Sequence, residues 1–249
     1  MAYTARYPSS RSFYYNPLPK GIKWLLIANT AVFLLQFLSA RLGFGTAFMD
    51  FGLWPRAVLT FPAIWQLVTY LFLHAGVWHL LINMLMLWMF GSDLERDWGA
   101  RRFLQYYFLC GVGAGICVVL SSLILRDLDS RTIGASGAIF GVLLAFGVCY
   151  PDRVILFMFL FPIKAKYFVM IMAAIEFLYT VQGSSSGVSH MAHLGGALFG
   201  YVYLKRRRMR FNVIEPLSRQ YHTWKMQRAK KKFQVYMRKR QHKHDHWVN

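Results

Sequence analysis

Residues 134–141 read Gly-Ala-Ser-Gly-Ala-Ile-Phe-Gly and open one of the most apolar segments of the chain. Gly137 and Gly141 are four residues apart, so they form a stripe of small residues along one face of a helix. Such a stripe allows a second helix in a membrane to approach closely. A matching stripe is formed by Gly196 and Gly200, within the sequence Ala-His-Leu-Gly-Gly-Ala-Leu-Phe-Gly. We therefore expect two membrane helices to pack through these glycines.

This packing would bring the hydroxyl of Ser136 close to the imidazole of His193, which precedes Gly196 by three residues. A polar group inside a membrane is costly and is often functional. Taken alone, the serine is more commonly bonded to its own helix and the histidine is more commonly a packing residue. Together they indicate a nucleophile and its base. His190 is the other candidate base, but its helix face is bulkier, and we expect it to be solvated near the outer surface.

Composition places the chain among polytopic membrane proteins. Its 249 residues are 56% hydrophobic and carry a formal charge of +19, and the mean hydropathy is +0.34. Charge and apolar residues must therefore be segregated along the chain. We predict an all-α fold with six transmembrane helices, although several apolar stretches are shorter than the roughly 20 residues that span hydrocarbon. The predicted spans lie near residues 23–41, 77–90, 103–125, 136–150, 167–180 and 191–204.

The distribution of basic residues predicts the orientation. With both termini on one side, only four of the 29 Lys and Arg residues lie on the other side, namely Arg41, Arg56, Arg126 and Arg131. The positive-inside rule then places both termini in the cytosol, most simply at a bacterial inner membrane. Three segments are expected: a cytosolic segment (1–19), a six-helix domain (20–205) and a basic cytosolic tail (206–249). We expect no cleavable signal peptide at the N-terminus, and an odd number of cysteines argues against a disulfide framework.

A segment rich in aromatic residues and proline separates the first two predicted spans. Residues 44–77 are too aromatic for a solvated loop and too proline-broken for a spanning helix. We expect this segment to be partly embedded in the outer leaflet, although simple interfacial anchoring explains it equally well. Shortly after it, His79 and Asn83 share one helix face. They can either stabilise an oxyanion or join helices by hydrogen bonds.

The order of these motifs closely resembles the rhomboid intramembrane serine proteases over residues 20–205. It consists of His74, His79 and Asn83, then residues 134–137, then residues 192–200, with further matches at 91–99 and 161–164. The resemblance implies a dyad of Ser136 and His193 without a third acidic residue. It also implies an oxyanion hole made by the Ser136 backbone N–H with His79 and Asn83. Supporting residues would be His74, Gly134, Gly137, Phe140 and Gly196.

The implied function is cleavage of single-span or other transmembrane substrates, with no cofactor and no metal. Water would reach Ser136 and His193 through a polar cavity inside the protein.

Two positions depart from the family pattern: Gln66 follows Trp65 where relatives often carry arginine, and Phe140 replaces a tyrosine of some members. Glu176 lies inside the fifth predicted span, where we expect it to be protonated or hydrogen-bonded to a neighbouring helix and to have a structural role.

Parts of the sequence are compatible with three other functions. A catalytically inactive rhomboid-like protein would bind transmembrane helices, but such proteins lack the serine or the histidine. A histidine-lined metal or haem protein could use His74, His79, His190 and His193. Against it, no cysteine or carboxylate stands with these histidines in the sequence. The basic tail could bind nucleic acid, but beside a membrane it more simply meets anionic lipid headgroups.

Overall fold

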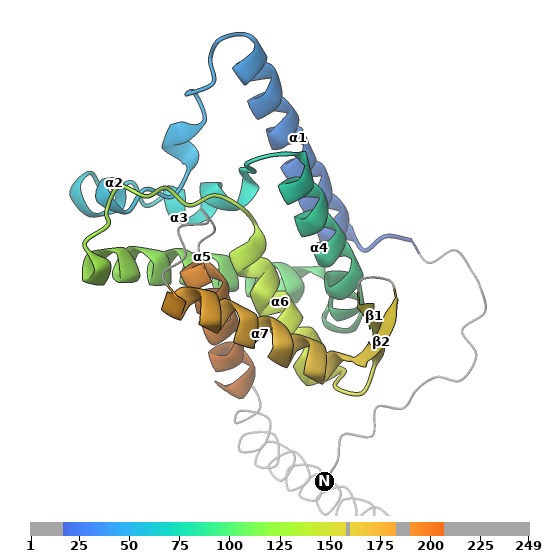
Figure 1. Ribbon diagram of the computed structural model, residues 1–249. Coiled ribbons are helices and arrows are strands. Elements are labelled where there is room, and N and C mark those ends of the chain that lie inside the picture. The colour runs from blue at the N-terminus through green and yellow to red at the C-terminus, as the bar shows by residue number, and fades with distance from the viewer. Residues whose placement is uncertain (1–16, 158–159, 183–189, 207–249) are drawn as a thin grey trace, which may run out of the picture. The chain divides into compact units, whose positions relative to one another are not determined.

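The computed structural model describes residues 17–157, 160–182 and 190–206, and almost all of its regular structure is helical. The N-terminal residues 1–16 and the basic tail from residue 207 lie outside the described residues. Residues 190–206 are helical. The other long helices, shown in Figure 1, are α1 (Lys20–Arg41), α4 (Val77–Trp98), α5 (Ala100–Leu125), α6 (Ser136–Cys149) and α7 (Ala165–Gln182). Each of the six apolar stretches thus forms a helix, as predicted.

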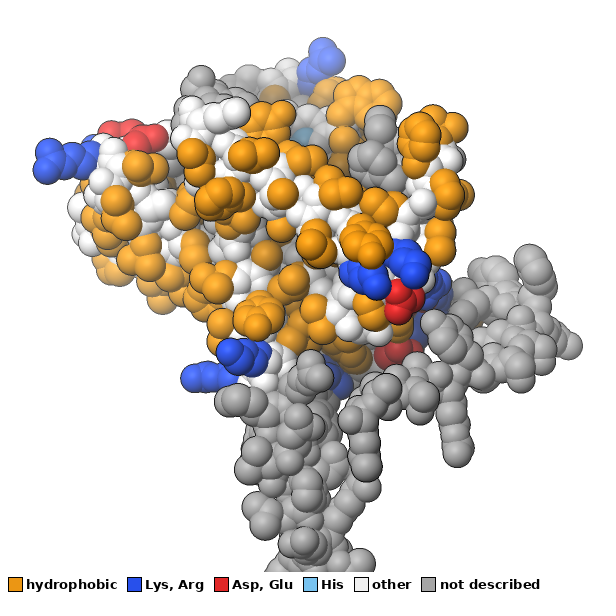
Figure 2. All heavy atoms as spheres, turned by 60° about the horizontal axis from the view of Figure 1, so that its bottom comes forward, with side chains coloured by type: hydrophobic (Ala, Val, Ile, Leu, Met, Phe, Trp, Pro, Cys, Tyr) orange, Lys and Arg blue, Asp and Glu red, His pale blue; other side chains and the backbone are white. Residues whose placement is uncertain are grey.

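Lengths and composition distinguish these helices. Among the described residues, α1, α4, α5 and α7 are long and apolar enough to cross a membrane. Helix α6 has only 14 residues, about 21 Å at the usual rise, and therefore falls short of a bilayer core about 30 Å thick. Hydrophobic side chains cover much of the described surface on the face that Figure 2 shows, and Lys and Arg occur there in a few small groups. The chain is thus a helical membrane protein, and the count of six spans stays a prediction.

Helix α6 packs against α4, α5 and α7, as Figure 1 shows. Nine of its 14 residues are buried. The two glycine stripes meet as predicted: a Cβ added to Gly196 would lie 1.8 Å from the carbonyl oxygen of Gly137. A Cβ added to Gly200 would lie 3.3 Å from the Cα of Gly141. Only glycine permits this approach of the helix 190–206 to α6.

Short helices fill the segment between α1 and α4. They are η1 (Met49–Phe51), α2 (Pro55–Thr60), α3 (Gln66–Thr69) and η2 (Tyr70–Phe72). Gln66 is buried, its side-chain oxygen accepts a hydrogen bond from the Trp54 N–H, and its amide donates to the Asp50 carbonyl, both at 3.0 Å. A neutral amide therefore ties this segment together at the position where an arginine was expected from the resemblance. The depth of the segment in a membrane stays a prediction.

The same segment fixes the connection that leads from α5 into α6. Leu53 and Thr132 exchange two backbone hydrogen bonds of 2.9 Å, and the Gly134 N–H donates to the Tyr70 carbonyl at 2.9 Å. Arg56 and Asp129 form an exposed ion pair across the two segments. Hydrogen bonding to the Arg56 guanidinium holds the pKa of the Asp129 carboxyl below its ordinary value. These bonds set the position from which α6 starts at Ser136.

Glu95 of α4 holds the start of α1. Its two carboxylate oxygens accept the backbone N–H groups of Gly21 and Ile22, each at 2.7 Å. The residue that precedes α1 is Pro19, which supplies no side-chain cap. The buried Glu95 carboxylate satisfies donors that would otherwise have no partner at the helix start and also interacts favourably with the helix dipole.

An antiparallel hairpin that the sequence analysis did not predict joins α6 to α7. Strands β1 (Val154–Phe157) and β2 (Phe161–Lys164) pair in a register that places Val154 opposite Lys164. The exposed cations of Lys164 and Lys166 flank the carboxylate of Asp152, with nitrogen–oxygen distances of 3.4 and 3.0 Å. Strand β2 therefore leads directly into the first turn of α7, the helix that carries Glu176.

Candidate active site

Ser136 is the first residue of α6. The backbone N–H groups in the first turn of a helix have no acceptor within the helix, and they point along the axis with a partial positive charge. Ala135 before it already has helical backbone angles, φ −73° and ψ −9°. The serine hydroxyl thus lies beside backbone donors that can face an anion, which is the arrangement that an acyl-transfer site requires.

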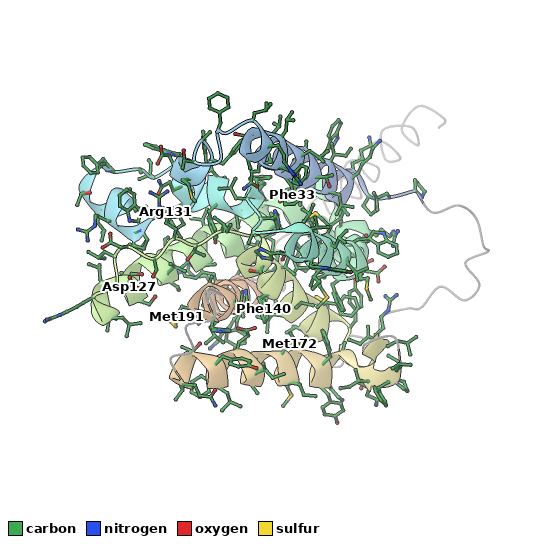
Figure 3. The ribbon with its side chains drawn as sticks, turned by 45° about the horizontal axis from the view of Figure 1, so that its top comes forward. Phe33, Asp127, Arg131, Phe140, Met172 and Met191 are labelled. Atoms are coloured by element: carbon green, nitrogen blue, oxygen red, sulfur yellow. The ribbon has the colours of Figure 1, made fainter. Side chains whose placement is uncertain are left out.

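The imidazole of His193 lies against this hydroxyl. The distance between His193 Nε2 and Ser136 Oγ is 2.7 Å, a hydrogen bond that joins the helix 190–206 to α6. The ring of Phe140 stacks on the imidazole with a centroid distance of 4.3 Å and an interplanar angle of 9°. Figure 3 shows Phe140 on the side of α6 that faces this helix. The predicted meeting of Ser136 and His193 is therefore present in the structure.

His79 lies beside the residues that precede the serine. The Ala75 N–H donates to His79 Nδ1 at 3.3 Å, which places the ring proton of a neutral imidazole on Nε2. A Cβ added to Gly134 would lie 2.8 Å from both Nε2 and Cε1 of this ring. Gly134 also has a φ of +122°, which side chains rarely tolerate. Glycine is thus required here both by the backbone and by the approach of His79.

Asn83 and His74 complete the group of polar side chains from this region. The Asn83 amide donates to the His79 carbonyl at 2.9 Å, which leaves its second N–H for another acceptor. Asn83 and His74 are both buried. The His74 ring packs edge-on against His79 with a centroid distance of 5.2 Å. The structure thus brings His74, His79 and Asn83 together, and it places His79 next to the turn that carries Ser136.

The carboxylate of Glu176, for which the sequence predicted only a structural role, lies on the far side of His193. Glu176 Oε2 of α7 is 2.9 Å from His193 Nδ1 and 2.7 Å from His190 Nδ1. The contact with His190 is a hydrogen bond, as predicted for Glu176 with a neighbouring helix. We expected no acidic residue beside the catalytic histidine, and this expectation is wrong because a carboxylate oxygen lies within hydrogen-bond distance of His193. The only signal in the sequence was an isolated carboxylate inside an apolar helix.

His190 also differs from its expected environment. Its side chain is only 11% exposed, and its ring stacks on Tyr179 with a centroid distance of 5.1 Å. The prediction of a solvated residue near the surface is therefore wrong, because Glu176 and Tyr179 of α7 cover the ring. His190 does not contact Ser136 in any hydrogen bond among the described residues.

The arrangement fits a known family. A family model described as "Rhomboid domain" matches residues 62–209. The chain belongs to the rhomboid family. Its rhomboid region thus includes every candidate site residue from His74 to His193.

Curated rhomboid relatives share about a third of the aligned residues. The putative rhomboid protease YdcA of Bacillus subtilis is 35% identical over 154 residues, which cover 59% of this chain and 71% of YdcA. Rhomboid protein 1, mitochondrial, of Saccharomyces cerevisiae is 30% identical over 76% of this chain and 54% of its own length. Rhomboid protease GluP of Bacillus subtilis is 34% identical over 61% of this chain, but this region is only 27% of GluP. The names of these relatives support an intramembrane protease at the level of the family.

The same geometry bears on the metal alternative. Glu176, His190 and His193 each offer a ligand atom, and these atoms lie within 4.8 Å of one another. A carboxylate thus does accompany two of the histidines, contrary to the expectation from the sequence. However, separations of 2.7 and 2.9 Å between the carboxylate oxygen and the two nitrogens are hydrogen-bond distances. Ligands of a tetrahedral zinc with bonds of about 2.0–2.1 Å lie further apart, at about 3.3 Å. The distances among these described groups therefore fit hydrogen bonds from the two imidazoles to the carboxylate better than shared ligation of a metal ion.

Proposed function

We propose that this rhomboid is an intramembrane serine endopeptidase that cleaves transmembrane segments of other membrane proteins. Ser136 is the nucleophile and His193 is its general base. The observation that carries the proposal is the 2.7 Å contact between Ser136 Oγ and His193 Nε2. A hydroxyl bonded to an imidazole that is itself held in place is the arrangement that activates a serine.

In the proposed reaction, His193 Nε2 takes the hydroxyl proton while Ser136 Oγ bonds to the carbonyl carbon of the scissile peptide. The tetrahedral intermediate then collapses, the carbon–nitrogen bond breaks, and Nε2 gives the proton to the departing amine. Water attacks the acyl-enzyme and transfers a proton to Nε2, and this proton returns to Oγ when the acid product leaves. Phe140 keeps the ring plane fixed during these transfers.

The negative charge that develops on the carbonyl oxygen needs hydrogen-bond donors. We assign this role to the Ser136 backbone N–H, the His79 Nε2–H and the second N–H of Asn83. Support comes from the hydrogen bond that Ala75 donates to His79 Nδ1, because it directs the His79 proton to Nε2. The bond from Asn83 to the His79 carbonyl links the two side chains, so each helps to orient the other.

Replacing Asn83 with Ala should lower kcat by about 10²-fold, the usual loss for one side-chain oxyanion donor. The KM should change little, since the interaction strengthens only in the transition state. His79→Ala should act in the same direction. Michaelis kinetics with a single-span substrate in lipid vesicles would measure both values. If both variants turned over at the wild-type rate, these residues would have no part in the mechanism.

The wider assignments follow the same proposal. Residues 20–205 would form the protease domain with six spans, between the segments 1–19 and 206–249. Both termini would lie in the cytosol, because most of the basic residues lie on that side. A bacterial inner membrane is the simplest location, although some relatives are named as mitochondrial or chloroplastic. Anionic headgroups are the proposed partner of the basic tail, and no nucleic acid is expected.

The decisive experiment uses purified full-length protein in vesicles with a panel of single-span proteins. We expect cleavage of members whose span carries helix-destabilising residues near its outer end, since the scissile backbone must unwind to reach a serine. The Ser136→Ala variant should leave every member intact while it retains the wild-type thermal stability. Binding of the substrates without cleavage by the wild-type protein would instead support the inactive, helix-binding alternative. Cleavage by Ser136→Ala would exclude Ser136 as the nucleophile.

A further inference from the structure

We propose that Glu176 is a positioning residue for His193, so that the site works as a Ser136–His193–Glu176 triad rather than as a serine–histidine pair. This inference rests on the proposed protease function. It assigns a role in catalysis to a carboxylate of α7, a helix that supplies neither the nucleophile nor the base.

The geometry that carries the inference is a line of three groups from three helices. Ser136 Oγ of α6 lies 2.7 Å from His193 Nε2. On the opposite edge of the same ring, Nδ1 lies 2.9 Å from Glu176 Oε2 of α7. Phe140 stacks on the ring and fixes its plane. The imidazole is thus constrained on two edges and one face, and Glu176 supplies the constraint on the second edge.

The tautomer of His193 explains why a carboxylate is useful at this place. Nε2 can accept the serine proton only if the ring proton of the neutral imidazole is on Nδ1. This Nδ1 is buried and makes no aligned hydrogen bond with any described residue. Glu176 Oε2 is close enough to accept its proton after a small rotation of either side chain. Catalytic hydrogen bonds are often poorly aligned before substrate binds, so we expect this bond to straighten in the substrate complex.

Burial gives the carboxylate a second effect. The side chain of Glu176 is 10% exposed and that of His193 is 8% exposed. Charges interact more strongly in such an environment than in water. When His193 takes the serine proton it becomes a cation, and an adjacent carboxylate stabilises this cation. His190 donates to the same oxygen, which offsets part of the cost of burying Glu176.

A purely structural role for Glu176 is the alternative. Only Ala165, Phe168 and Glu176 are buried in α7, so the carboxylate also anchors this helix to the helix 190–206. Both roles would make Glu176 important for activity. They differ in what they predict for folded protein, because an anchor changes stability whereas a positioning residue changes the chemistry of His193.

The test compares Glu176→Gln with wild-type protein in vesicles. We expect kcat for a single-span substrate to fall between about tenfold and 10³-fold, with KM changed less than about twofold, as for loss of a transition-state interaction. Labelling of Ser136 by a fluorophosphonate should slow in parallel. The acid limb of the pH–rate profile should move to lower pH, because a neutral amide no longer favours the charged imidazole. The titratable groups that face His193 are Glu176 from α7, His190 from its own helix and His79 from α4.

Glu95→Gln is the matched control. Glu95 is also a buried carboxylate with two short hydrogen bonds, but it joins α4 to the start of α1. We expect this variant to melt at a lower temperature and to keep the wild-type kcat and pH profile. Glu176→Asp retains the charge at a shorter reach, and its labelling rate should lie between those of Glu176→Gln and the wild type.

Three results would overturn the inference. The first is a wild-type kcat and an unshifted acid limb in folded Glu176→Gln. The second is fluorophosphonate labelling of Ser136 in Glu176→Asp at the wild-type rate. This result decides the matter if the glutamine variant does not fold. The third is loss of wild-type activity in EDTA with recovery on adding zinc, since the cluster would then hold a metal. The proposed function fails separately, through cleavage by Ser136→Ala.

Discussion

Replacing His193 with Ala should abolish both substrate cleavage and labelling of Ser136 by a fluorophosphonate. We expect the rate to fall by about 10⁴-fold or more, because removal of the base from a serine hydrolase eliminates most of its advantage over water. The structural reason is direct: Nε2 of His193 is hydrogen-bonded to Ser136 Oγ at 2.7 Å. Time courses of cleavage in vesicles and gel detection of the labelled serine would measure both effects.

His190→Ala is the matched control for this prediction. His190 lies three residues earlier on the same helix and contacts the same carboxylate oxygen, but among the described residues the hydrogen bond to the serine comes from His193. Its removal should leave measurable cleavage and labelling, reduced by about tenfold or less, since Glu176 would still face His193. An active His193→Ala together with an inactive His190→Ala would transfer the base assignment to His190.

The second large effect is expected for Gly196→Ala. The added Cβ would lie 1.8 Å from the Gly137 carbonyl oxygen, whereas an ordinary Cβ contact lies at 3.4–4 Å. The helix 190–206 would therefore have to move away from α6 by more than 1 Å. Such a displacement costs about 10²-fold in rate even when the fold survives, and overpacking of this kind destabilises by about 1–3 kcal/mol or more. Thermal unfolding and cleavage assays would report the two losses.

Gly45→Ala controls for the loss of a glycine. Its added Cβ would meet only Ala40, at 3.8 Å or beyond, and its backbone is not in the left-handed region. We expect stability and cleavage to stay at the wild-type values. Wild-type stability and cleavage in Gly196→Ala would show that the close contact between the two glycine stripes is not required.

Part of the site could be predicted because its signals are local. Apolar runs predicted the six long helices of the described residues, since burial in hydrocarbon demands continuous stretches of such residues. The spacing of Gly137 and Gly141 against Gly196 and Gly200 predicted which two helices touch, because only residues without side chains allow that approach. The meeting of Ser136 and His193 then followed from their places beside the glycines.

Glu176 could not be placed in the same way. A single carboxylate in an apolar helix signals a partner but not its identity, because no repeat in α7 tells which face turns inward. Its partners His190 and His193 lie on another helix and are separated from it along the chain. The hairpin of residues 154–164 was missed for a related reason. Its short strands are paired only with each other, and their sequences do not alternate clearly between apolar and polar residues.

The distribution of the site over separate helices has a consequence for the time at which activity arises during synthesis. The pair that would perform the chemistry is 57 residues apart along the chain, and the base lies on the last described helix. A nascent chain that ends after α6 carries the serine with no imidazole against its hydroxyl. If the proposed mechanism holds, the serine stays unactivated until the helix 190–206 docks against α6, and proteolytic competence arises only then.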